Sequence, residues 1–148
     1  MRFVSDGIVM LSERDGSTQL YKYGTNGALQ QRLTQGEWDI INFYGCDSEG
    51  NVYYQAADET PTQRRVLKTT PRGKTTVLAG EAGINRASFT QDYSYFINSY
   101  SNAKTPTITT IRTAKEGKVI RTLEDNAQLV AKLKGYDYND KEFFTIEV

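Results

Sequence analysis

Gln31-Arg32-Leu33-Thr34 is the first of three strand-like segments that decide the fold of this 148-residue chain. The later copies are Thr76-Val77-Leu78-Ala79 and Arg121-Thr122-Leu123-Glu124, and the central leucines are spaced by 45 residues. A turn glycine stands five or six residues before each leucine, at Gly27, Gly73 and Gly117. A strand that returns after a turn at a fixed spacing indicates a structural unit of about 45 residues.

The rest of each unit also favours strands. Tyr, Phe and Thr are frequent and lie in short alternating runs, such as Ile8-Val9-Met10-Leu11 and Val52-Tyr53-Tyr54, bounded by Gly, Asn and Asp. Four short antiparallel strands in about 45 residues is the period of a β-propeller blade. We therefore predict an all-β fold, a partial β-propeller of about three four-stranded blades. The alternative is a plain β-sandwich in which the periodicity is accidental.

The predicted propeller spans residues 1–124. Its blades are expected at about 1–35, 36–80 and 81–124, and the first lacks most of its inner strand. Natural propellers close four to eight blades into a ring, so three blades leave two open sheet faces. Open faces of this kind favour self-association or pairing with partner strands.

Residues 125–148 follow a different pattern and are expected to form a connecting helix and a strand. Asp125 or Asn126 can cap a helix near 126–134, and Gly135 can end it. The alternation of residues 142–148 predicts a strand after this helix.

The composition excludes several kinds of chemistry within this chain. There is no His, which excludes a Ser-His-Asp triad, a His-ligated zinc and a His general base. The single Cys46 cannot form an intrachain disulfide and is read as a small buried filler. Equal numbers of basic and acidic residues, 18 of each, predict no nucleic-acid partner. No apolar run reaches the ~20 residues of a membrane span.

Three motifs could carry a ligand, but each has a simpler interpretation. Arg72-Gly73-Lys74-Thr75 ends like a phosphate-binding loop but has Lys68 where the first glycine is required, so it predicts a hairpin turn. Asp47-Ser48-Glu49-Gly50 has the closely spaced carboxylates of a calcium loop but lacks the twelfth-position Glu, so it predicts a solvated hairpin turn. Trp38 is expected to be a packing anchor. We predict no catalytic, cofactor-binding or metal-binding residue and no cofactor.

An ordered set of segments resembles the propeller of the dipeptidyl peptidase IV family. The resemblance is carried by Ser12-Glu13-Arg14-Asp15-Gly16, Thr34-Gln35-Gly36-Glu37-Trp38-Asp39-Ile40, Phe43-Tyr44-Gly45, Asn51-Val52-Tyr53-Tyr54, Ala87-Ser88-Phe89-Thr90 and Arg121-Thr122-Leu123-Glu124-Asp125-Asn126. The last of these resembles the segment where that propeller meets an α/β-hydrolase domain. The resemblance covers essentially the whole chain.

The resemblance implies a role in a serine peptidase of the prolyl oligopeptidase type that removes N-terminal X-Pro or X-Ala dipeptides. This chain would be the C-terminal part of an eight-bladed propeller, with the connecting helix and the first hydrolase strand. The catalytic Ser, Asp and His would lie beyond Val148, and the amine-binding glutamates and an arginine before Met1. The implied role of this segment is that of a scaffold and substrate gate. Its implied partners are a peptide substrate and the α/β-hydrolase domain of the same parent chain.

Two alternatives and one question of location remain. A non-catalytic propeller that binds protein or carbohydrate would share the pattern, as would a three-unit β protein that completes its ring by oligomerising. The stretch Phe3-Val4-Ser5-Asp6-Gly7 breaks a signal-peptide core, which indicates a cytoplasmic chain or a missing natural N-terminus. The family resemblance instead implies a periplasmic or exported protein.

Overall fold

The computed structural model, which describes residues 1–58, 60–137, 139 and 141–147, contains three four-stranded antiparallel sheets. Sheet 1 consists of β1 (Arg2–Val4), β2 (Gly7–Ser12), β3 (Gln19–Gly24) and β4 (Leu29–Arg32). Sheet 2 consists of β5 (Ile40–Cys46), β6 (Val52–Ala56), β7 (Arg65–Thr69) and β8 (Thr75–Ala79). Sheet 3 consists of β9 (Ile84–Phe89), β10 (Tyr95–Ser101), β11 (Ile108–Thr113) and β12 (Val119–Glu124). The predicted all-β propeller fold is confirmed.

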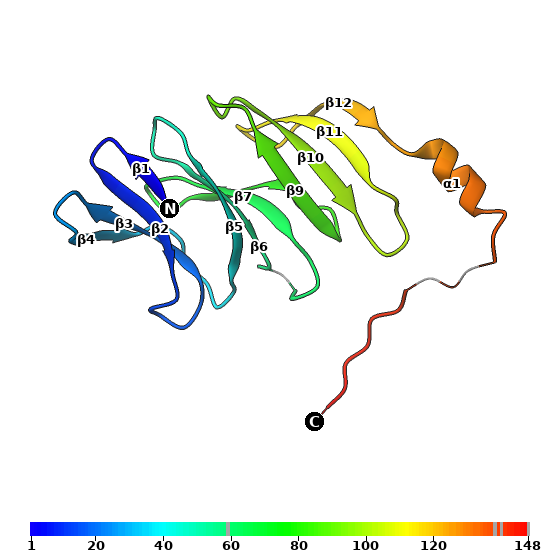
Figure 1. Cartoon of the computed structure of the whole chain (residues 1–148), viewed down its shortest axis with the longest axis horizontal. Coiled ribbons are helices and arrows are strands. Elements are labelled where there is room, and N and C mark those ends of the chain that lie inside the picture. The colour runs from blue at the N-terminus through cyan, green and yellow to red at the C-terminus, as the bar shows by residue number, and fades with distance from the viewer. Residues whose placement is uncertain (59, 138, 140, 148) are drawn as a thin grey trace.

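The sheets stand side by side like the ribs of a fan (Figure 1). In each sheet the strands follow one another in chain order, so every neighbouring pair is a simple hairpin. Among the first strands, β1 contacts β5 and β5 contacts β9, and these strands form the inner side of the fan. Strand β1 has only three residues, which agrees with the expectation that the first blade is short on this side.

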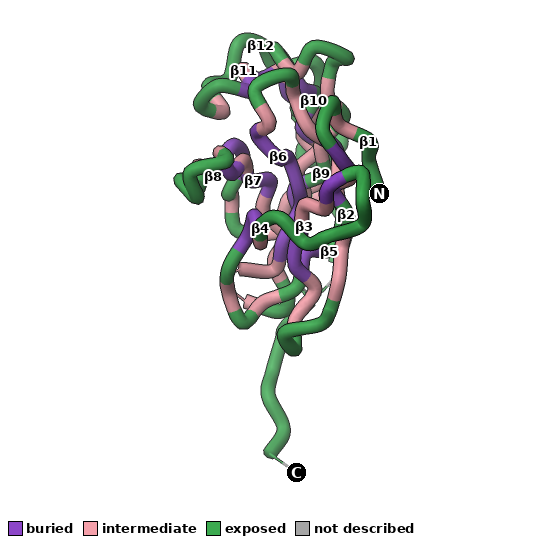
Figure 2. The backbone as a smooth tube through the Cα atoms, turned by 90° about the vertical axis from the view of Figure 1, so that its left-hand side faces the viewer, coloured by how far each residue is buried: buried purple, intermediate pink, exposed green. Residues whose placement is uncertain are grey.

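The core consists of two apolar layers, one between each pair of neighbouring sheets. Sheet 2 supplies both layers because successive strand residues point to opposite faces. Tyr54 and Leu67 pack toward sheet 1, whereas Tyr53 and Val66 pack toward sheet 3. All five residues of β6 are therefore buried, and Figure 2 shows this strand in purple near the middle of the molecule.

The 45-residue repeat is visible in the turns but only partly in the burial. Gly27, Gly73 and Gly117 all have φ near +80°, between 77° and 82°, a left-handed conformation that favours glycine. Leu33 and Leu78 are buried, but Leu123 is 46% exposed. The difference arises because β12 lies in sheet 3, and no further sheet covers that side among the described residues.

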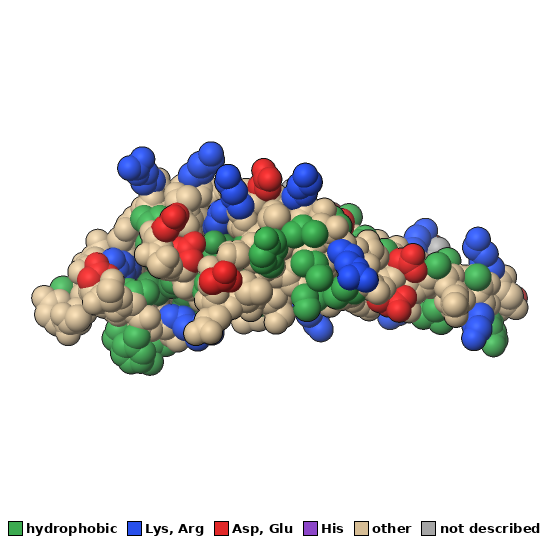
Figure 3. Space-filling model, turned by 90° about the horizontal axis from the view of Figure 1, so that it is seen from above, with side chains coloured by type: hydrophobic (Ala, Val, Ile, Leu, Met, Phe, Trp, Pro, Cys, Tyr) green, Lys and Arg blue, Asp and Glu red, His purple; other side chains and the backbone are tan. Residues whose placement is uncertain are grey.

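The predicted C-terminal helix is present as α1 (Ala127–Leu133). The carboxylate of Asp125 accepts a hydrogen bond from the Ala127 amide at 2.9 Å, while the Asn126 side chain donates to the carbonyl of Thr107. None of the helix residues is buried. The helix extends away from sheet 3 (Figure 1), and the molecule has an elongated outline (Figure 3).

The strand predicted at 142–148 is not formed by residues 141–147, and Val148 lies outside the described residues. The alternation of this segment is suited to a strand, but a strand also needs a hydrogen-bonded neighbour. Residues 141–147 have no such neighbour among the described residues, and their side chains are exposed.

Candidate functional site

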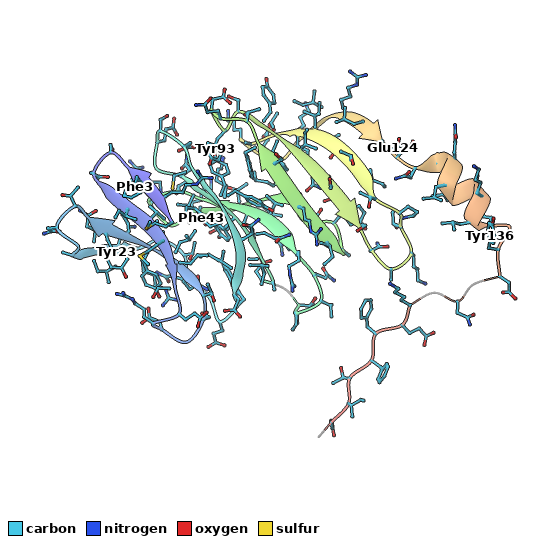
Figure 4. All side chains as sticks on the ribbon, in the orientation of Figure 1. Phe3, Tyr23, Phe43, Tyr93, Glu124 and Tyr136 are labelled. Atoms are coloured by element: carbon cyan, nitrogen blue, oxygen red, sulfur yellow. The ribbon has the colours of Figure 1, made fainter. Side chains whose placement is uncertain are left out.

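A cleft of about 1020 Å³ opens where the inner turns of the three sheets meet. The β1–β2 turn contributes Ser5 and Asp6, and the β5–β6 turn contributes Asp47 to Gly50. The end of β9 and the following turn, with Tyr93, form a further part of the wall, and Gln31, Leu33 and Pro71 also line the cleft. Phe3 and Tyr93, labelled in Figure 4, both belong to this lining. The cleft exists because up-and-down sheets place every first hairpin turn at the same end of the fan.

Aromatic side chains from sheets 2 and 3 support one side of the cleft. The ring of Tyr93 stacks on Tyr53 with centroids 4.7 Å apart, and Phe89 contacts both rings and that of Tyr44. The hydroxyl of Tyr93 donates to the carbonyl of Tyr44 at 3.1 Å. A Cβ atom at Gly45 would collide with this hydroxyl, and Gly45 has φ 140°. Glycine at position 45 therefore allows the two sheets to join at this point.

The charged groups of the cleft are already paired with protein groups. Lys22 donates to Asp6 at 2.7 Å, and this hydrogen bond lowers the pKa of the Asp6 carboxyl. One carboxylate oxygen of Asp47 accepts from the amides of Glu49 and Asn51, and the other accepts from the hydroxyl of Tyr53 at 2.9 Å. Burial, and then this bond to Asp47, raise the pKa of Tyr53. These interactions stabilise the turns.

Cys46 also lines the cleft but is not arranged as a nucleophile. Burial is the main cause that raises the pKa of its thiol to about 11, and the charge of Asp47 adds to the effect. A thiol with this pKa is almost entirely protonated at neutral pH and reacts slowly. Its position against the core between sheets 1 and 2 supports the interpretation of Cys46 as a filler, although it is only partly buried.

The other motifs of the sequence have structural roles. Residues 70–74 form a hairpin turn in which the Gly73 amide donates to the Thr70 carbonyl at 2.8 Å, as predicted. Asp47 is occupied by its own turn, and no cluster of three potential metal ligands occurs among the described residues. Trp38 packs against the core between sheets 1 and 2 and stacks on Tyr54, with centroids 6.1 Å apart. It is a packing anchor, as predicted.

The cleft itself was not predicted from the sequence. Its walls combine residues of all three units, such as Asp6, Asp47 and Phe89, that are more than 40 residues apart. The available signal was the recurrence of acidic turn residues at Asp47 and Asp92, one repeat apart. The surface of the cleft is a mixture of polar and apolar groups, and its charged side chains bind other protein groups.

Four-stranded antiparallel sheets that stack face to face, with their first strands together, define this chain as part of a β-propeller. Residues 1–107 match the family described as the dipeptidyl peptidase IV (DPP IV) N-terminal region. The chain therefore belongs to the dipeptidyl peptidase IV N-terminal region family.

Individual relatives agree with this assignment. The chain is 30% identical to a probable dipeptidyl peptidase 4 of Emericella nidulans over 148 residues, covering 95% of this chain and 18% of that protein. It is 28% identical to dipeptidyl peptidase 4 of Trichophyton rubrum over 144 residues, covering 95% and 19%. The crystal structure of Porphyromonas gingivalis dipeptidyl peptidase 4 matches with a TM-score of 0.92 and 42% identity, over 97% of this chain and 20% of that one.

The chain thus spans about a fifth of the length of these relatives, between 18% and 20%. None of the described helices is both long and apolar enough to cross a membrane.

Proposed function

We propose that this chain is the scaffold and substrate gate of a dipeptidyl peptidase IV-like serine exopeptidase. The parent enzyme would remove X-Pro or X-Ala dipeptides from the N-termini of peptides. The observation that carries the proposal is the match to Porphyromonas gingivalis dipeptidyl peptidase 4, at 42% identity and a TM-score of 0.92. These comparisons favour a peptidase segment over a non-catalytic propeller that binds protein or carbohydrate.

The division of labour follows from the chemistry that this chain lacks. Acyl transfer by a serine hydrolase requires an imidazole to accept and return the proton, and this sequence has no His. The Ser, Asp and His would be supplied by an α/β-hydrolase domain of the same parent chain. The carboxylates Asp6 and Asp47 of the cleft are engaged with Lys22, Asn51 and Tyr53, which suits a structural role.

We attribute the proposed selection of substrates by size to the rigidity of the blades. Two continuous apolar layers hold sheet 2 between its neighbours, and the aromatic contacts of Tyr93 fix the inner turns. Turns held in this way keep the width of the cleft constant, so it could admit peptides according to size. Residues 125–137, with α1, would lead the chain from the last blade to the hydrolase domain. We place the parent enzyme in the periplasm or outside the cell, in keeping with the family resemblance.

The proposal is tested by exchanging the segment. The matching part of Porphyromonas gingivalis dipeptidyl peptidase 4 is replaced by this chain, and hydrolysis of a Gly-Pro chromogenic substrate is measured. If this segment is a scaffold, the turnover of the chimera should be near that of the unmodified enzyme. A chimera that also carries Phe96→Ala should lose thermal stability before it loses turnover. A chimera that folds with normal stability but has no turnover would show that this segment lacks the proposed role.

The purified chain alone provides the second arm of the test. It should not hydrolyse Gly-Pro or Ala-Pro substrates. Hydrolysis that persists through repurification and without a contaminating serine hydrolase would contradict the assignment of catalysis to another domain. Sequencing of the flanking coding region should reveal a Gly-x-Ser-x-Gly motif downstream, followed by Asp and His.

A further inference from the structure

The outer hairpin turns of sheets 2 and 3 carry an unpaired group of basic residues. The β7–β8 turn supplies Arg72 and Lys74, and the β11–β12 turn supplies Lys115 and Lys118 with the exposed Glu116 between them. All four are exposed, and among the described residues none of them takes part in an ion pair. Because the whole chain has a net charge of zero, this group reflects a local separation of charge. We call these four residues the basic rim.

The β11–β12 turn rests on strands β7 and β8 of sheet 2. Lys68 of β7 donates to the carbonyls of Ala114 and Lys115 at 3.2 and 2.6 Å. A Cβ atom at Gly117 would collide with the carbonyl of Leu78 in β8, so the turn lies directly on sheet 2. Figure 3 shows a row of Lys and Arg side chains along one edge of the molecule, with an acidic side chain among them. The basic rim is therefore a preformed patch across two blades.

Exposed aliphatic side chains adjoin the basic rim. Val77 follows the first basic turn on β8, and Val119 and Ile120 follow the second on β12. The corresponding turn of sheet 1, residues 25–28, contains no charged residue, although Leu29 after it is also exposed. Cations at hairpin tips with aliphatic groups beside them are the combination that binds anionic bilayer surfaces, where charge attracts and apolar groups enter the interface.

We propose that the basic rim, with Val119 and Ile120, is a peripheral docking surface for an anionic lipid bilayer. The cations are exposed on hairpin turns and have long side chains, which suits a flat and diffuse array of phosphate groups. The aliphatic neighbours suit a bilayer, because apolar groups beside cations can enter its interfacial region. Strand β12 starts at the basic rim and ends at Glu124, so the chain continues into α1 from the opposite end. The proposal is independent of the peptidase assignment.

The test is co-sedimentation of the full chain with vesicles at low salt. Vesicles of phosphatidylcholine alone are compared with vesicles in which about a quarter of the lipid is phosphatidylglycerol. We expect binding only to the anionic vesicles and its loss at about 0.5 M salt, where charges are screened within a few ångströms. The double variant Arg72→Gln/Lys74→Gln should bind roughly thirtyfold more weakly, from about 1 kcal/mol for each cation near the surface.

The matched control removes the same charge elsewhere. Lys132→Gln/Lys134→Gln, at the C-terminal end of α1, should bind as the unmodified chain does, with unchanged thermal unfolding in both double variants. An equal loss in the control would overturn the proposal, because binding would then depend on net charge. Binding to neutral vesicles, or to soluble polyglutamate without any binding to anionic vesicles, would also overturn it. The polyglutamate result would indicate an acidic polypeptide partner.

Discussion

Adjacent residues of β10 should respond very differently to truncation, because sheet 3 is covered on one face. Phe96 points toward sheet 2, is 1% exposed, and stacks on Phe89 with centroids 5.0 Å apart. Ile97 points the other way and is 43% exposed. An aromatic side chain buries roughly 150–250 Å², which at about 25 cal/mol per Å² is worth roughly 4–6 kcal/mol. Measured Phe→Ala losses of about 3–5 kcal/mol agree with this value.

We therefore expect Phe96→Ala to lower the free energy of unfolding by about 3–5 kcal/mol. Ile97→Ala should cost about 1 kcal/mol or less, because much of that side chain is already in water. At this chain length each kcal/mol shifts the melting temperature by roughly 2–4 °C, so Phe96→Ala should shift it by about 6–20 °C. Urea unfolding followed by circular dichroism, together with thermal unfolding, measures both variants.

Equal losses for the two variants would refute the reasoning, since they would show that both faces of sheet 3 are covered. A small loss for Phe96→Ala would also refute it, because the layer between sheets 2 and 3 would then contribute little. Ile111 of β11 pairs with Ile97, and Ile111→Ala gives a second test of the open face. Ile111 is partly buried, so the loss for Ile111→Ala should lie between those of Ile97→Ala and Phe96→Ala.

Three further predictions concern the inner turns. Cys46 should react with iodoacetamide at pH 8 about a hundredfold more slowly in the folded chain than in urea, because folding raises the pKa of its thiol from 9.0 to about 11. Similar rates in the two conditions would contradict this. Gly45→Ala should lower the free energy of unfolding by about 1–3 kcal/mol, because the added Cβ meets the Tyr93 hydroxyl, and an unchanged urea midpoint would be inconsistent with that contact. Hydrogen bonds from Ser94 and Thr90 lower the pKa of Asp92 to about 2, so its contribution to stability is complete above its ordinary pKa of 3.8 and is lost as the pH falls toward 2. Asp92→Asn should reduce the pH dependence of urea unfolding in that range, and an unaltered acid profile would argue against these bonds.

The strands and turns could be predicted because their causes are local. Alternation along Val52-Tyr53-Tyr54 and the turn glycines Gly27 and Gly73 reflect preferences of short segments, and both are present in the structure. The helix over Ala127–Leu133 was predicted for the same reason. The strand at 142–148 was not borne out by residues 141–147, since its formation depends on a neighbour that alternation cannot supply.

The cleft and the basic rim could not be predicted because their causes are not local. Gly45 and Tyr93, or Lys68 and Lys115, lie more than 40 residues apart and meet only when the sheets stack. The repeat also suggested equal roles for Leu78 and Leu123, but one is buried and the other exposed. Burial depends on which sheet faces which, and that is a property of the assembled fan.

The amino-acid sequence by itself determined the all-β character, the period of the blades, the place of the turns and the absence of imidazole chemistry. Each of these follows from residue type and spacing over a few positions, which a chain carries before it folds. Tertiary structure alone decided which face of each sheet is buried, which turns line the cleft and which cations lie together at the basic rim. Those features need surfaces from distant segments to meet, and side-chain packing selects the partners only once the sheets are formed.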